Sequence, residues 1–100
     1  MASVKPIEDC EGVPHANVFP TEEPKTIRLS LDEGESVGAH NHPERQVILY
    51  LISGEIDLQL DGESHIVQSG DVVQFDGTCE VAPAAKIDST ALIVLAKKSE

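Results

Sequence analysis

The chain has 100 residues, 40% of them hydrophobic, which is enough for one domain with one core. Its 18 acidic and 7 basic residues give a net charge of −11, and this charge would repel nucleic-acid phosphates and anionic membrane surfaces. Aromatic residues make up only 3% of the chain, too few for the stacking platforms of single-stranded nucleic-acid binders. We therefore expect neither nucleic acid nor a membrane among its partners.

The two cysteines, Cys10 and Cys79, have a spacing that matches no zinc or redox motif. No apolar segment follows a basic N-terminal start, and no apolar run approaches the roughly 18 residues of a membrane-spanning helix. The sequence therefore predicts a cytoplasmic protein whose thiols are reduced.

Residues 1–25 are expected to form an extended N-terminal arm, because prolines interrupt them and no periodicity is sustained. At most a short edge strand is predicted in this arm, near residues 16–19. His15 lies in the same arm and is expected to be solvated.

A regular strand pattern begins after the arm. Apolar and polar residues alternate over residues 26–32, which is typical of a half-buried strand. A turn at Glu33-Gly34 and a segment with two histidines follow. Residues 47–52 then form a continuous apolar run, which is typical of a strand buried on both faces.

The second half of the chain continues with short strands separated by turns. Asp61-Gly62, between two such strands, is a strong signal for a two-residue hairpin. His65 follows that turn and is expected to be exposed. Strands are predicted over residues 55–60, 65–67, 71–75, 79–85 and 91–96. Because no helical period occurs, residues 26–100 are predicted to form a single all-β sandwich or barrel.

His40 and His42 are the most informative residues of the chain. On a β-strand, residues i and i+2 point to the same face, so the two imidazoles could converge on one ligand or ion. Neutral imidazole is the commonest protein ligand for transition metals. The pair is therefore a candidate binding site.

The order of glycines and histidines resembles that of the cupin superfamily. The first cupin motif is matched by Gly34, the segment His40-Asn41-His42 and Gly54, and Gly70 opens the counterpart of the second motif. The resemblance covers about residues 26–96. It implies a jelly-roll barrel, also called a double-stranded β-helix, with the histidine pair at the barrel mouth.

The chain departs from the cupin pattern at two metal-ligand positions. The place of the family glutamate is held by Gln46 at the shorter motif spacing or by Val47 at the longer one. Strand parity places Gln46, not Val47, on the face of His40 and His42. Counting on from Gly70 without a gap, Val81 occupies the place of the third family histidine. Fewer and neutral ligands bind a cation less tightly.

One interpretation of the site is a metal-dependent enzyme of the isomerase, lyase or dioxygenase type that the superfamily contains. A single divalent transition metal (Ni, Fe, Mn, Zn or Cu) would be held by His40, His42 and Gln46. Glu44 shares strand parity with His42, and Cys79 with the position of the third histidine, so either could add a further ligand.

The alternative, which the sequence favours, is a module that binds a small polar or cationic molecule in the barrel mouth without a metal. Its predicted pocket residues are His40, His42, Gln46, Val81 and Tyr50. Dimers are frequent in cupins, and the long apolar strands need a cover, so a homodimer is also expected.

Overall fold

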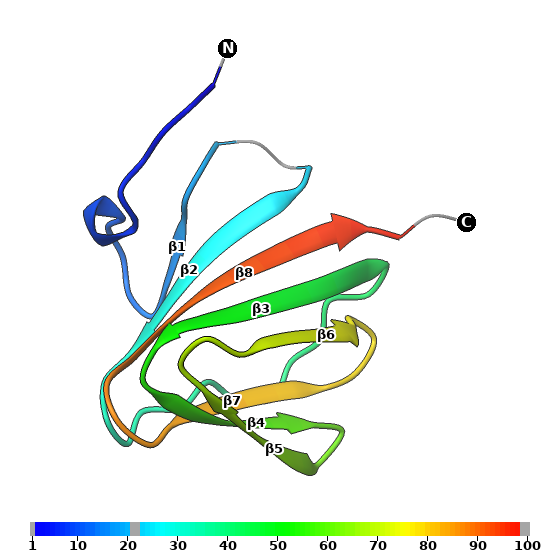
Figure 1. The fold of residues 1–100 in the computed structure, drawn as a ribbon. Helices are drawn as coiled ribbons and strands as arrows, with labels where there is room; N and C mark the ends of the chain where they lie inside the picture. The colour runs from blue at the N-terminus through cyan, green and yellow to red at the C-terminus, as the bar shows by residue number, and fades with distance from the viewer. Residues whose placement is uncertain (1, 21–22, 99–100) are drawn as a thin grey trace.

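The computed structural model describes residues 2–20 and 23–98, and it consists mostly of antiparallel strands (Figure 1). The elements in chain order are the 3-10 helix η1 (Ile7–Asp9), β1 (His15–Asn17), β2 (Lys25–Leu31), β3 (Arg45–Ser53), β4 (Glu55–Leu60), β5 (Glu63–Gln68), β6 (Val72–Asp76), β7 (Val81–Ala85) and β8 (Ser89–Lys97). One sheet has the strand order β1-β2-β8-β3-β6 and the other β5-β4-β7. The predicted all-β jelly-roll fold is confirmed.

The hydrophobic core lies between the two sheets. It is made of alternate residues of each strand, because side chains of a strand point to opposite faces in turn. The largest fully buried side chains are Leu29, Val47, Leu49, Leu51, Ile56 and Leu58. Burial of such side chains stabilises a fold by about 1.5–3 kcal/mol each.

The outer face of β3 is open, which corrects the prediction that residues 47–52 are buried on both faces. Ile48 and Tyr50 keep 37% and 41% of their surface exposed, whereas Val47, Leu49 and Leu51 are buried. The strand lies in an antiparallel sheet, and such a sheet can be covered on one face only.

The predicted hairpin at Asp61-Gly62 is confirmed as the turn between β4 and β5. Both residues have positive φ angles, 51° and 83°, as a two-residue turn that matches the strand twist requires. His65, on β5, is exposed as predicted, and its Nε2 atom lies 3.7 Å from a carboxylate oxygen of Glu63.

The N-terminal segment is attached to the barrel rather than extended away from it. Its strand β1 pairs with β2, with His15 opposite Leu29 and Ala16 opposite Arg28. Arg28 is buried, and its guanidinium donates hydrogen bonds to the backbone oxygens of Cys10 (3.4 Å) and Gly12. A small apolar cluster beside these contacts contains Cys10, Ala16 and Val18, with Ile7, Phe19 and Leu92 packed on it.

No helix in the described ranges is long and apolar enough to cross a membrane. Cys10 and Cys79 are both free thiols.

Candidate functional site

His40 and His42 lie in the connection between β2 and β3, which runs beside β7. The backbones of His40 and Val81 exchange two hydrogen bonds, of 3.1 and 2.7 Å. The N–H of His42 donates to the carbonyl oxygen of Gly77, in the loop after β6, at 2.7 Å. Both histidines are therefore held by backbone hydrogen bonds, His40 to β7 and His42 to the loop between β6 and β7.

The two imidazole rings meet edge to face. Their centroids are 5.0 Å apart and their planes are perpendicular. The Nδ1 atom of His40 lies 2.8 Å from the carbonyl oxygen of Gly38. Because a carbonyl oxygen can only accept, Nδ1 is the donor of this contact, and in the neutral tautomer that this selects the Nε2 atom has a lone pair for a ligand.

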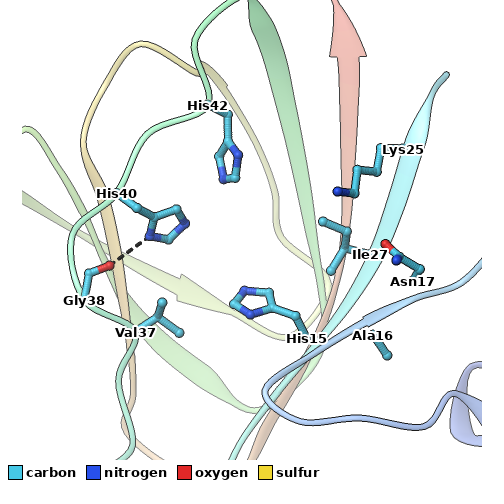
Figure 2. Close-up of a pocket in the computed structure, with 9 residues that line it drawn as sticks. All are labelled: His15, Ala16, Asn17, Lys25, Ile27, Val37, Gly38, His40 and His42. Atoms are coloured by element: carbon cyan, nitrogen blue, oxygen red, sulfur yellow. Dashed lines mark hydrogen bonds between the residues drawn. The ribbon is translucent and has the colours of Figure 1, made fainter. Parts of the chain in front are cut away.

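A third imidazole, that of His15, faces the same pocket from β1. Figure 2 shows the rings of His15, His40 and His42 pointing into one space, with the side chain of Lys25 reaching toward it. The pocket has a volume of about 500 Å³. His15 is exposed, as expected, but it does not belong to a free arm, because β1 pairs with β2 at the barrel mouth and His15 lines the pocket there.

The pocket continues into a smaller apolar cavity inside the barrel. All three histidines line both spaces, so they stand at the boundary between the open mouth and the interior. The cavity is otherwise lined by apolar residues of both sheets, namely Ile27, Leu29, Val47, Leu49, Leu58, Phe75, Val81, Pro83 and Ile93. Val81 thus lies against the histidines, where the sequence placed it.

Gln46 is not among the residues that line either space, and Val47 takes its place on the inner face. The strand parity that joined Gln46 to His42 does not hold. Glu44 has a left-handed backbone with a φ of 67°, and the N–H of Arg45 bonds back to the oxygen of His42 at 3.2 Å. This turn reverses the parity before β3 begins.

The remaining predicted residues also lie away from the histidines. Glu44 is exposed at the turn. Cys79 packs against the core, and loss of solvent, with a hydrogen bond to Asp61, raises the pKa of its thiol. Tyr50, predicted in the pocket, is on the outer face of β3.

The predicted metal ligands are therefore not gathered around one point. Among residues 2–20 and 23–98, no group of three or more His, Cys, Asp or Glu side chains is placed to hold a metal ion. The three imidazoles line one pocket without a carboxylate beside them. This donor set does not fit the three-histidine and one-glutamate pattern that the resemblance implied.

The imidazoles of His15 and His42 are disposed to remain neutral. Partial burial, and then the neighbouring His40 ring, lower the pKa of His15. The pKa of His42 is lowered by burial first, and further by His40, His15 and the cations Lys25 and Arg45. Neutral imidazoles can both donate and accept hydrogen bonds.

These shifts predict that the free energy of unfolding falls as the pH is lowered below 6.5. The unfolded chain binds protons at its ordinary histidine pKa of 6.5, whereas folded His15 and His42 bind them only at lower pH. The contribution of these two histidines to the free energy of unfolding is therefore fully present above pH 6.5, and it is lost as the pH falls from 6.5 toward their lowered pKa values. Urea unfolding at about pH 7.5 and about pH 5.5 measures this loss.

The matched variants for that measurement are His15→Gln/His42→Gln and, as the control, His65→Gln on exposed β5. We expect the double variant to lose less stability between the two pH values than the parent, and the control to behave like the parent. An unchanged loss in the double variant would show that other groups cause the pH dependence.

Comparison with known families decides the affiliation of the chain. The family model of the cupin domain matches residues 27–95. The chain belongs to the cupin family. The match contains the histidine pair and both sheets of the core, but it begins after β1, so His15 lies outside it.

Solved structures share the fold of this cupin at low sequence identity. An uncharacterized conserved protein with a double-stranded β-helix domain from Klebsiella pneumoniae has a TM-score of 0.84 and 16% identity, covering 97% of this chain and 91% of its own. A predicted oxalate decarboxylase from Thermotoga maritima has a TM-score of 0.76 and 24% identity, with coverage of 84% and 79%. The cupin domain of an XRE family transcriptional regulator from Enterobacter cloacae has a TM-score of 0.75 and 18% identity, with coverage of 85% and 96%. No curated protein matches the chain.

Proposed function

We propose that this cupin binds a small molecule in the pocket at the barrel mouth. The observation that carries the proposal is the arrangement of His15, His40 and His42, which come from two separate segments and face one space of about 500 Å³. A concave site with a few convergent polar groups above an apolar floor is the usual form of a small-molecule site.

The polar and apolar parts of the pocket have different roles in this proposal. The lone pair on Nε2 of His40 and the neutral ring of His42 hydrogen-bond the polar group of the ligand. Val47, Phe75 and Val81 contact its apolar part. Gln46 and Tyr50, which the sequence included, take no part because they lie outside both spaces.

A metal-dependent enzyme is the second candidate, and the chain's donors support it less well. Gln46, Glu44 and Cys79 do not join the histidine pair, so we derive no step through a metal. The named relatives include a predicted oxalate decarboxylase and a regulator domain, so the shared fold does not choose between catalysis and ligand binding.

The test of the proposed function is a thermal-unfolding and calorimetric screen of the chain with small organic acids, amides, amines and sugars. The same screen includes Ni, Fe, Mn, Zn and Cu ions, each alone. We expect at least one organic probe to bind the parent. His40→Ala/His42→Ala is expected to lose that binding, because it removes both rings. His65→Ala is the control and keeps it.

Two results would contradict the proposal. The first is an organic probe that binds the double variant as tightly as the parent, since the site would then lie elsewhere. The second is the absence of any organic ligand, together with a stoichiometric metal that the parent holds and His40→Ala/His42→Ala loses. That second result would support the metal-dependent alternative.

We also propose that two copies of the cupin associate through the outer face of the five-stranded sheet. Ile48 and Tyr50 are exposed there, and Val72, opposite Tyr50 on β6, is 64% exposed. These side chains form an uncharged apolar patch on a chain with a net charge of −11, which is where a like-charged copy can approach.

Light scattering is expected to give the mass of two chains for the parent. Tyr50→Glu/Val72→Glu should give the mass of one chain, because it places charges in the patch. Ile66→Glu is the matched control, since Ile66 is 49% exposed on β5 in the other sheet. A parent that has the mass of one chain at all concentrations would contradict the dimer.

A further inference from the structure

We propose that the N-terminal segment adds an anion subsite to the pocket, where Lys25, His15 and Asn17 bind the carboxylate of a small monocarboxylate with a short apolar tail. This inference rests on the proposed function, since it names the class of molecule that the same pocket accepts.

The subsite is built from residues outside the part of the chain that matches the cupin family. Four of the nine residues that line the pocket, His15, Ala16, Asn17 and Lys25, precede residue 27, where the family match begins. β1 and the start of β2 bring them to the barrel mouth, opposite His40 and His42 (Figure 2). The wall that faces the histidine pair is therefore a feature of this chain's own N-terminal segment.

The charge of this wall favours an anion. Among the described residues that line the pocket or the inner cavity there is no aspartate or glutamate, although the chain has 18 acidic residues. Lys25 lines the pocket, and its side chain reaches toward the space that the three imidazoles face (Figure 2). A cationic ligand, which was expected from the sequence as an alternative to a polar one, would meet the ammonium group of Lys25 in a pocket whose described lining residues include no carboxylate.

A neighbouring acidic residue is occupied by other partners. Glu23 lines the adjacent cleft together with Lys25. Its carboxylate pairs with the guanidinium of Arg45 at 2.5 Å and accepts the backbone N–H of Lys97 at 3.1 Å. The carboxylate of Glu23 thus already has a cationic partner in Arg45 and a donor in Lys97.

The number of charges favours a carboxylate over a phosphate. Among the described residues that line the pocket, Lys25 is the one lysine or arginine. One ammonium group with hydrogen-bond donors around it balances a single negative charge. The amide of Asn17 and neutral imidazoles supply such donors. A phosphate monoester carries close to two negative charges at neutral pH and would be left with an unbalanced one.

The inner cavity limits the length of the tail. It is apolar apart from the three histidines and has a volume of about 40 Å³. Since one small group needs about 10–15 Å³ of such volume, the cavity takes about three carbon atoms. Butanoate has this form, with a carboxylate at the mouth and a three-carbon tail.

The test is an NMR titration of the full chain with butanoate, compared with butanamide, butylamine and butyl phosphate. We expect butanoate to shift the signals of the pocket residues with a dissociation constant in the millimolar range, as is usual for a ligand of this size. Butanamide has the same shape without the charge and should bind about two- to fivefold more weakly. Butylamine should cause no shifts at the pocket.

Variants of the chain then distinguish binding at the anion subsite from binding in the rest of the pocket. Lys25→Met should weaken the binding of butanoate by about two- to fivefold and leave the binding of butanamide unchanged. His15→Ala should also weaken butanoate. Lys86→Met is the control, because Lys86 is exposed and pairs with Glu55 at 3.6 Å, away from the pocket; it should bind all four probes like the parent.

Equal binding of butanoate and butanamide, unaffected by Lys25→Met, would overturn the anion subsite and leave the pocket itself standing. Tighter binding of butyl phosphate than of butanoate would overturn the monocarboxylate class. If no carboxylate binds while a sugar, amide or amine binds at His40 and His42, the inference fails and the proposed function holds. If no organic probe shifts any pocket residue, both fail.

Discussion

Replacement of Gly77 by alanine is expected to destabilise this cupin by about 2–3 kcal/mol and to abolish ligand binding in the same variant. A Cβ atom at Gly77 would lie 2.2 Å from the backbone oxygen of His42 and 2.7 Å from that of Arg45. These atoms belong to the backbone and cannot turn away as a flexible side chain would. The backbone oxygen of Gly77 also accepts the N–H of His42 at 2.7 Å, and the N–H of Gly77 donates to the oxygen of Arg45 at 2.8 Å. The added methyl group therefore displaces the turn that positions His42.

Chemical unfolding and the probe screen on the same protein measure the two effects. Gly38→Ala is the control for the free energy of unfolding, because Gly38, in the connection between β2 and β3, has no positive φ angle and has no atom within 4 Å of the place that the added methyl group would take. The control should change the free energy of unfolding by less than about 0.5 kcal/mol. A Gly77→Ala variant as stable as Gly38→Ala would contradict the close approach of the β6–β7 loop to His42.

The fold of this cupin could be predicted from the sequence because its strands depend on local patterns. The alternating pattern over residues 26–32 predicted the strand observed as β2. Asp61-Gly62 forms the two-residue turn that these residue types favour. The position of Val81 beside His40 followed from the family spacing and agrees with the two backbone hydrogen bonds that join them. Where neighbours in sequence determine the conformation, sequence reasoning succeeds.

The side of the sheet on which Gln46 lies could not be predicted, because the turn at Glu44, between the histidines and β3, changes which alternate residues point inward. Glu44 adopts a positive φ, which is uncommon for a residue with a side chain. A glycine at this position would have indicated such a turn, but a glutamate does not. A strand without that turn would have kept Gln46 on the histidine face. Pro43, directly before Glu44, was the available signal that regular strand geometry ends here.

The part that His15 takes in the pocket could not be predicted, because its position depends on a contact between segments that are distant in sequence. His15 follows a proline-rich stretch without periodicity, and only the pairing of β1 with β2 brings it to the pocket. The apolar run of β3 posed a similar problem, since hydrophobicity alone does not reveal whether a second layer covers its outer face. Both cases depend on tertiary structure rather than on local pattern.

The attachment of the N-terminal segment leads to the last prediction, which concerns Arg28. Arg28→Met is expected to release residues 8–18 from the barrel and to weaken ligand binding to the level of His15→Ala. The methionine fills a similar volume, but it leaves the backbone oxygens of Cys10 and Gly12 without their donor. Hydrogen bonds from a charged donor contribute about 1.5–3 kcal/mol each, and the small cluster around Ala16 adds little area to replace them.

Hydrogen exchange with mass spectrometry measures the release directly. Peptides over residues 8–18 should lose protection in Arg28→Met, while peptides of β3 and β4 keep theirs, because the main core between the sheets does not contain Arg28. Lys5→Met, which changes an exposed basic residue in the same segment, is the control and should leave the protection unchanged. If Arg28→Met keeps full protection over residues 8–18, the guanidinium is not what holds His15 at the pocket, and the β1–β2 pairing alone is sufficient.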